Sequence, residues 1–392
     1  MDFMREAENI SSQIVEDRRR LHRCAEIGFD LTETTAHVVG RLRNMGLRPI
    51  KVGKCGIVAQ IGNGDGKCIM LRADMDALPI AEKCELPFSS DNGNMHACGH
   101  DLHTAMLLGA ADILSKNSDK IQGRVLLCFQ GAEEILAGAQ DMIENGIIDK
   151  YKPDMAIMIH TIVGIDLERD TVIISSPGVS AASADFFSIR ISGASSHGAT
   201  PHLSRDALFC ANEIYRAIYT IPVRELSVDD GATLSVGALF GGEAANVIAD
   251  TAVIKGTCRT FSGSARDKLK SRIGEYATAI AKMHDVECEV DFYAGAPTLI
   301  NDADVSARAY ACVNELIGRK CIYSADLGTR GGGSEDFAYF SHLIPSLMIG
   351  LMAGAVEDGY NVGAHNPRTV FDERALALGA AIYAKCAIDL LK

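Results

Sequence analysis

Short apolar runs alternate with amphipathic helical patterns along the first half of the chain. We expect strands at 56–61, 68–72, 123–130 and 154–160, and helices at 5–24, 32–45, 103–114 and 138–145. Strands that alternate with helices in this way favour an α/β domain in which helices cover a central sheet. The glycine cluster at 62–66 lacks the spacing of a phosphate-binding loop, and its place between two strands predicts a hairpin turn.

The pattern changes near Ser183. From there the expected order is strand, helix, two strands, helix and strand, at 186–192, 204–221, 232–240, 251–260, 265–284 and 286–293. This β-α-β-β-α-β order is typical of a ferredoxin-like unit. After Pro297 the first pattern returns, with helices at 303–317 and 373–391 and a strand at 346–351. The sequence therefore predicts one discontinuous α/β domain (1–182 and 296–392) that carries an inserted domain (183–295).

Composition excludes several classes of partner. The 392 residues are 47% hydrophobic and carry a formal net charge of −13 without a Lys- or Arg-rich run, so binding to nucleic acid or to an anionic membrane is not expected. No apolar run approaches the roughly 20 residues that span a bilayer, and residues 1–6 contain no apolar signal core. The 12 cysteines form no Cys-x-x-Cys pair, which is typical of free thiols in a reducing compartment. We expect a soluble cytoplasmic protein.

The densest cluster of metal-binding residue types is the segment 96–103, which holds three histidines, one cysteine and one aspartate. Imidazole and thiolate are preferred ligands of zinc and neighbouring divalent metals. On an extended backbone Cys98 and His100 leave the same face and can meet one ion. A polar loop with incidental histidines is the alternative, because Cys-x-His is not a standard structural zinc pattern.

Further polar clusters follow predicted strands, where open α/β sheets place their ligands. They are Asp74 with Asp76, Glu133 with Glu134, His160, and His365. Each cluster alone has an ordinary explanation: a charged strand end, solvated glutamates before a helix, a satisfied core histidine, or a turn. Of two adjacent glutamates, however, one can bind a metal while the other faces the substrate as a general base.

Taken together, these clusters supply more ligands than one four-coordinate ion needs. The five candidate ligands are Cys98, His100, Glu134, His160 and His365. They suit two metals that share ligands, as in hydrolytic two-metal sites, with Glu133 beside them. We expect Asp76 and Asp101 to support the ligands, and His96 and His103 to have supporting or structural roles.

These motifs, in this order, resemble the M20 metallopeptidase family over nearly the whole chain. The nearest branch is that of the amidohydrolases, which includes hippurate hydrolase, N-acyl-amino-acid deacylases and plant indole-acetyl-amino-acid hydrolases. The segments that carry the resemblance are 72–79 (RADMDALP), 95–101 (MHACGHD), 130–134 (QGAEE), 195–202 (SSHGATPH), 246–250 (NVIAD) and 334–337 (SEDF). The cysteine of segment 95–101 is specific to this branch, because other M20 enzymes have an aspartate there.

The resemblance implies a dimetal catalytic domain in which the five candidate ligands hold two divalent ions, zinc or manganese, with nickel and cobalt as alternatives. It implies that Glu133 is the general base and later the general acid. His197, Asn246 and Arg259 resemble residues of the inserted domain that bind the scissile carbonyl and the substrate carboxylate. His202 is a further substrate-binding candidate, although a turn residue there, and a surface strand residue at Arg259, are the alternatives. The inserted domain is expected to be a lid that forms a homodimer.

Two positions depart from the family pattern. Gly131 stands where the family usually has a proline before Ala-Glu-Glu, and Ala249 replaces the proline of Asn-Val-Ile-Pro. Both changes alter the stiffness of a loop rather than the ligand chemistry, because proline fixes φ and glycine frees it.

The sequence therefore predicts a metal-dependent amidohydrolase that cleaves the amide bond of a small N-acyl amino acid. A metallo-dipeptidase or carboxypeptidase of the same family is the alternative. A non-catalytic binding protein on this fold would have lost a ligand or the base, and neither is lost here. A serine hydrolase would need a Gly-x-Ser-x-Gly segment, which the chain does not contain.

Overall fold

The computed structural model describes residues 1–62, 66–328 and 333–392. The chain divides into two units. The first unit comprises Met1–Ser180, Ile300–Arg330 and Asp336–Lys392, and the second comprises Ala181–Leu299 and Gly331–Glu335. Each unit has its own hydrophobic core.

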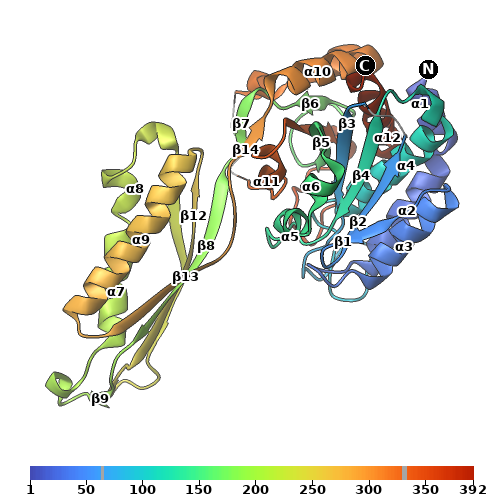
Figure 1. Ribbon diagram of the computed structural model, residues 1–392. Coiled ribbons are helices and arrows are strands. Elements are labelled where there is room, and N and C mark those ends of the chain that lie inside the picture. Colours follow the sequence, from blue (N-terminus) through green and yellow to red (C-terminus); the bar gives the residue numbers. More distant parts are fainter. Residues whose placement is uncertain (63–65, 329–332) are drawn as a thin grey trace. The chain divides into compact units, whose positions relative to one another are not determined.

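The first unit is built on a mixed sheet of eight strands (Figure 1). Its order is β1-β2-β4-β3-β5-β16-β6-β15, with β1 (Ile50–Val52), β2 (Gly56–Ile61), β3 (Cys68–Asp74), β4 (Arg124–Gln130), β5 (Met155–Ile162), β6 (Val172–Ile174), β15 (Cys321–Tyr323) and β16 (Ser346–Met352). The four central strands β4, β3, β5 and β16 run parallel to one another. Their carboxyl ends therefore meet at one edge of the sheet, where polar side chains from different strands come together.

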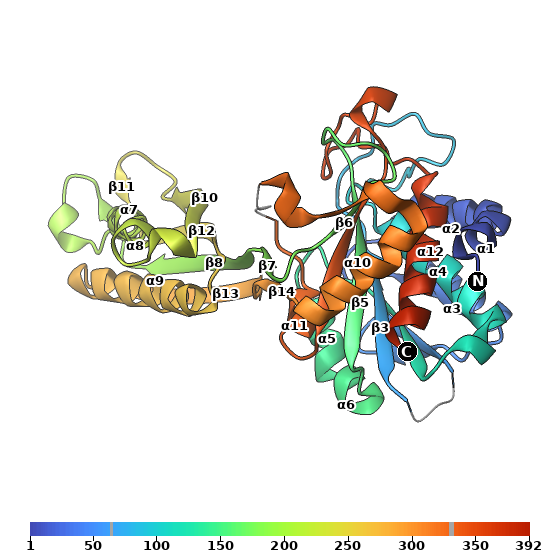
Figure 2. The same cartoon turned by 90° about the horizontal axis from the view of Figure 1, so that it is seen from above.

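Helices cover both faces of this sheet (Figures 1 and 2). One face carries α1 (Phe3–Asn9), α2 (Ser11–Cys24), α3 (Thr32–Asn44), α4 (His100–Lys116) and α12 (Ala375–Leu390), and the other carries α5 (Gly138–Glu144), α6 (Ile147–Tyr151) and α11 (Ala338–Ser341). Helix α10 (Ala303–Ile317) packs on α12. Helices α4 and α12 are buried on nearly all sides, because they lie between the sheet and other helices and their sequences are apolar around the whole circumference.

The second unit has the element order β-α-β-β-α-β. It consists of β8 (Ser183–Ser192), α7 (Ala207–Ile218), β10 (Thr233–Gly241), β12 (Thr251–Thr260), α9 (Gly263–Met283) and β13 (Glu287–Ala296). The four strands form an antiparallel sheet in the order β10-β12-β8-β13. The apolar faces of α7 and α9 pack on this sheet, together with the short helix α8 (Ile221–Arg224).

Two local expectations are wrong. The helix expected at 5–24 is two helices, α1 and α2, which meet at Ile10. The hairpin expected at 62–66 does not form, because β4 lies between β2 and β3 and pairs with both. Residues 63–65 themselves lie outside the described part of the chain. The sheet order depends on pairing between distant segments, which a local turn signal does not report.

Several short elements have no clear signal in the sequence. Besides β1, β6, β15 and the short helices, they are β7 (Gly178–Ala181), β9 (Ser196–His197), β11 (Val247–Ile248) and β14 (Leu299–Asn301). Strands of two to four residues are too short to show a period, so only their pairing partners define them. Within the described residues, none of the helices has the length and apolar character that crossing a membrane requires.

Candidate metal centre

Side chains from several strand ends converge at one edge of the first unit's sheet. Asp76 follows β3, Glu133 and Glu134 follow β4, and His160 lies near the carboxyl end of β5. Cys98 and His100 stand at the start of α4, and His365 comes from the loop after β16. The parallel order of β4, β3, β5 and β16 places these segments side by side, although up to 267 residues separate two of the side chains that touch.

The five predicted ligands form two groups that share Cys98. One group is Cys98, His100 and His160, and the other is Cys98, Glu134 and His365. The Cys98 Sγ lies 3.6 Å from His160 Nε2 and 3.3 Å from His365 Nε2. His365 Nε2 in turn lies 3.6 Å from Glu134 Oε2. Within each group the donor atoms lie within 4.8 Å of one another, so each group can surround one ion.

Two of the candidate ligands, His100 and His160, present the same ring nitrogen, Nε2, to the site. His100 Nδ1 donates to the backbone carbonyl of Asp76 at 2.9 Å, and His160 Nδ1 donates to the carbonyl of Thr161 at 2.8 Å. A hydrogen bond of this kind fixes the tautomer, so that Nε2 carries the lone pair that a metal needs. His100 Nε2 is fully buried and makes no hydrogen bond with the described residues.

The chemistry of this donor set fits divalent cations. Burial raises the pKa of the Cys98 thiol, and the nearby His100 acts in the opposite direction. A cysteine that binds metal as a thiolate, two imidazoles oriented by backbone carbonyls and a carboxylate suit zinc or a similar borderline-soft ion. Carboxylate oxygens of Asp74, Glu133 and Glu134 lie 3.8 to 4.0 Å from His100 Nε2.

Asp76 makes hydrogen bonds to three residues of the site. Its carboxylate accepts hydrogen bonds from the backbone amides of Glu133 at 2.9 Å and Glu134 at 3.1 Å. Its backbone carbonyl accepts from His100. Asp76 therefore orients one candidate ligand and the segment that carries Glu133, as a residue that supports the ligands should.

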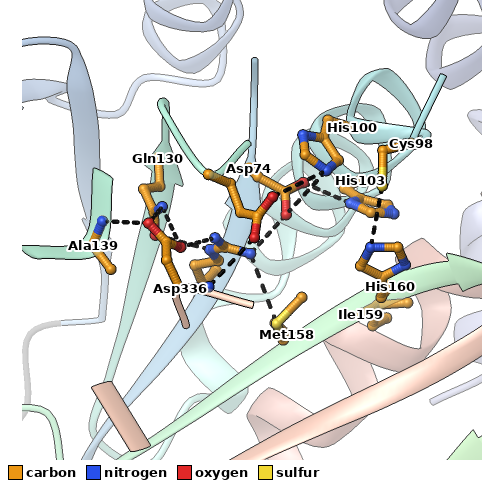
Figure 3. A network of polar contacts seen from close by, with 12 residues as sticks. Asp74, Cys98, His100, His103, Gln130, Ala139, Met158, Ile159, His160 and Asp336 are labelled. Atoms are coloured by element: carbon orange, nitrogen blue, oxygen red, sulfur yellow. Dashed lines mark hydrogen bonds and ion pairs between the residues drawn. The ribbon is translucent and has the colours of Figure 1, made fainter. Parts of the chain in front are cut away.

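Glu133 is buried beside the ligands. Its Oε2 lies 4.0 Å from His100 Nε2, and its Oε1 accepts a hydrogen bond from the backbone amide of Asp336 at 3.3 Å. Asp336 lies in the segment 334–337, which the sequence singled out without a role. Its carboxylate joins Arg72 and Gln130 in a buried network (Figure 3). The sequence contains no direct sign of this contact, apart from the place of Ser-Glu-Asp-Phe among the segments that carry the family resemblance.

The two remaining histidines of segment 96–103, His96 and His103, are buried in the protein core beside the site. His103 donates through Nδ1 to Asp74 at 2.6 Å and accepts through Nε2 from the amide of Thr161 at 2.8 Å. Burial lowers the pKa of His103 to about 4, against the effect of Asp74, so this ring is neutral. His96 is also fully buried, and burial lowers its pKa to about 3.

The support expected from Asp101 is wrong. Its Oδ2 instead accepts hydrogen bonds from Arg18 Nε and His22 Nδ1 of α2, both at 2.8 Å. Successive residues of a helix point about 100° apart, so Asp101 faces α2 while His100 faces the site. Asp101 therefore fastens α4 to α2.

Glycines fit two tight places around the ligands. Gly99 precedes α4 with a φ of +87°, and a Cβ there would clash with the Thr161 hydroxyl. Gly131, where the family usually has a proline, is packed against Cys55 and Leu31, each 2.5 Å from where a Cβ would lie. The neighbouring side chains of this protein thus fill the space that a ring would occupy.

The four predicted substrate-binding residues all lie in the second unit. His197 on β9 pairs with Val247 on β11, next to Asn246, so these two residues are neighbours. His202 is exposed in the turn that follows. Arg259 lies on β12 opposite Ala184 at the other end of β8, and its Nη1 donates to Ser334 Oγ at 3.4 Å.

A model of peptidase family M20/M25/M40 matches residues 70–389. The chain belongs to this family. It is 37% identical over 371 residues to N-acetyl-L-cysteine deacetylase of Bacillus subtilis, an alignment that covers 94% of this chain and 85% of the relative. It is 33% identical over 397 residues to hippurate hydrolase of Campylobacter jejuni, with 100% of both chains covered.

A solved M20 structure has the same fold. It is the YXEP protein of Bacillus subtilis, described as a dinuclear metal binding peptidase, with a TM-score of 0.79 and 29% identity over 98% of this chain and 99% of that one. As an M20 member with such relatives, the chain is a hydrolase that acts on amide bonds. It carries candidate ligand groups for a dinuclear metal centre.

Proposed function

We propose that this protein is a metal-dependent amidohydrolase that cleaves N-acyl amino acids into a carboxylic acid and an amino acid. The observation that carries the proposal is the pair of ligand groups that share Cys98, with the buried Glu133 carboxylate beside them. The names of two relatives, hippurate hydrolase and N-acetyl-L-cysteine deacetylase, both denote hydrolysis of an N-acyl amino acid.

The two ligand groups would hold two divalent cations, zinc or manganese, with nickel or cobalt as alternatives. The ligands would be Cys98, His100, Glu134, His160 and His365. When bound, such a pair of cations polarises a carbonyl and lowers the pKa of a water molecule.

Glu133 would move the proton of the reaction. One carboxylate oxygen is held by the Asp336 amide, and the other faces His100. In this position Glu133 would take a proton from the attacking water and deliver it to the leaving amine. Burial of Glu133 keeps competing water away from that carboxylate.

His197 would stabilise the negative charge that develops on the substrate oxygen. Its Nδ1 accepts a hydrogen bond from the amide of Ala199 at 3.1 Å, so a neutral His197 carries its proton on Nε2. This N–H is the donor that an oxyanion requires. Arg259 would bind the free α-carboxylate, since a guanidinium matches a carboxylate in a bidentate way. Asn246 and His202 would complete the contacts with the substrate.

We propose that the second unit is a ferredoxin-like lid that forms a homodimer. His197 and Arg259 lie at opposite ends of β8: Arg259 pairs with Ala184, and β9 follows the far end of the strand at Ser192. Eight residues of strand span roughly 26 Å, which is too far for one small substrate to touch both side chains. Two copies of the chain would bring one residue each.

We also propose a cytoplasmic location, since all 12 cysteines of the chain are free thiols. The partner of the protein would then be a small-molecule substrate from that compartment rather than a nucleic acid or a membrane.

Replacing Glu133 tests the proposed reaction. We expect Glu133→Gln to retain bound metal, because the five ligands remain, and to lower kcat by at least about 100-fold, because a general base contributes that much. Metal analysis and turnover would be measured side by side, with Glu8→Gln, an exposed residue of α1, as the control. Near-normal turnover in Glu133→Gln would refute the proposed base.

A substrate panel separates the proposed function from its alternative. Metal-loaded enzyme would be incubated with N-acetyl, N-benzoyl and indolylacetyl amino acids and with dipeptides, and the released amine would be measured. We expect N-acyl amino acids to be preferred by kcat/KM. Preference for dipeptides would assign the chain to the metallo-dipeptidases or carboxypeptidases of the family.

A further inference from the structure

The segment that carries Glu133 and Glu134 joins β4 to α5 through a conformation that needs outside support. Two of its non-glycine residues have a positive φ, Ala132 at 59° and Leu136 at 55°. Residue 138 must be glycine, because a Cβ there would clash with the carbonyl of Gly131. Backbone of this kind persists where contacts from elsewhere in the fold hold it in place.

The Asp336 carboxylate contacts both ends of this segment. At the start, Gln130 Nε2 donates to its two oxygens at 2.8 and 2.9 Å. At the end, the amide of Ala139 donates to Oδ2 at 2.9 Å. Arg72 Nη2 donates to Oδ1 at 2.8 Å and Arg72 Nη1 donates to Asp74 at 2.7 Å, so one guanidinium lies between two fully buried carboxylates.

The backbone of Asp336 contacts the middle of the same segment. Its amide donates to Glu133 Oε1 at 3.3 Å, while the Asp76 carboxylate accepts from the amides of Glu133 and Glu134. One residue thus fixes the two ends of the segment through its side chain and the Glu133 carboxylate through its amide.

We propose that Asp336 is a positioning residue that sets the place of the Glu133 carboxylate. The proposal rests on the proposed function, in which Glu133 is the base. Placement errors of about 1 Å can cost on the order of 100-fold in rate, so a residue with this role affects kcat although it does not touch the substrate. Metal binding should depend on it less, because the Glu134 amide is held by Asp76.

The carboxylate of Asp336 cannot be replaced by an amide of the same size without disturbing the segment. The neighbouring groups of Arg72, Gln130 and Ala139 that face it are all N–H donors. The amide group of asparagine would turn its own N–H toward one of these donors, and that donor would lose its acceptor. Asp336→Asn therefore keeps the volume but releases one end of the segment.

The experiment combines kinetics with a double-mutant cycle. We expect Asp336→Asn to lower kcat by about 10- to 100-fold, with KM and bound metal changed by less than about twofold. In a Glu133→Gln background the same substitution should cost less than about twofold, because the carboxylate that it positions is already absent. Asp17→Asn is the matched control, since Asp17 of α2 is another buried aspartate of the first unit, and it pairs with His37 and Arg41 of α3.

A second variant covers the case in which Asp336→Asn does not fold. Ala139 is the second residue of α5, where an N–H has no partner within the helix and proline is tolerated. Ala139→Pro removes the donor at the end of the segment, and we expect it also to lower kcat while metal is retained.

Three results of the kinetic and metal assays would overturn the inference: an unchanged kcat in both variants, the same loss of rate with and without Glu133, or a loss that is explained by missing metal. A crystal structure of Asp336→Asn separates this inference from the proposed function. If Glu133→Gln is fully active, the proposed base is wrong, and a Glu133 carboxylate that stays in place in Asp336→Asn overturns the positioning role independently.

Discussion

At the scale of single residues, the site depends on which atoms of each side chain are already hydrogen-bonded. His100 and His160 each donate a hydrogen bond from Nδ1 to a backbone carbonyl, so Nε2 is the ring nitrogen that faces the site. The residue types at the strand ends were predictable, because strand ends are where α/β sheets bind ligands. Asp101 shows the limit of that reasoning, since its neighbour His100 is in the site and it is not.

Gly99 offers a test at this scale. We expect Gly99→Ala to destabilise the protein by at least about 1 kcal/mol and to lower metal content, because alanine is strained at a φ of +87° and its Cβ would displace Thr161. Thermal unfolding and metal analysis would measure both effects. Gly40→Ala, on the exposed face of α3 where a Cβ meets nothing within 4 Å, is the control and should be neutral or stabilising. Equal behaviour of the two variants would contradict this account.

At the scale of elements, a buried charge network fastens α4, which begins with His100, to α2. Arg18 and His22 of α2 both donate to Asp101, and His22 Nε2 lies 3.3 Å from the Glu82 carboxylate. Burial alone would lower the pKa of His22, but Asp101 and Glu82 outweigh it, and the pKa is raised. The network thus joins α2 to the first turn of α4 and depends on the charge of His22.

This shift predicts how the stability changes with pH. Because the pKa of His22 is higher in the folded protein than the unfolded value near 6.5, its contribution is fully present below about pH 6.5 and is lost as the pH rises through the folded value. We expect His22→Gln to cost about 1.5–3 kcal/mol at pH 6 and progressively less at higher pH, as measured by denaturant unfolding. His284→Gln, in the second unit, controls for the loss of a histidine. A cost that grows with pH would contradict the assignment.

At the scale of the whole molecule, the second unit separates residues that the proposed reaction needs together. His197 and Asn246 are neighbours at the β9–β11 pair, whereas Arg259 lies at the other end of β8. This spacing is the physical basis for the proposed homodimer, in which each site takes residues from two chains.

Mixed dimers test that arrangement. We expect His197→Ala and Arg259→Ala each to be nearly inactive alone and to recover about a quarter of the wild-type activity when exchanged in equal amounts, because half of the dimers are mixed and each has one intact site. His197→Ala exchanged with Asn246→Ala is the control and should recover nothing, since these two residues come from the same end of one chain. Absence of recovery in the first mixture, with dimers shown to exchange, would rule out the shared site.

The sequence by itself determined the chemistry: which residue types are present, that they follow strands, and that α/β and β-α-β-β-α-β patterns occur in turn. Periodicity and motif spacing are local properties, so they can be read along the chain.

The tertiary structure decided which of those residues are neighbours. It inserted β4 between β2 and β3, made Cys98 common to two ligand groups and turned Asp101 toward α2. It also brought Asp336 to Glu133 across 203 residues of chain. Such contacts follow from strand order and helix packing, which link segments far apart in the sequence and leave no local pattern in it.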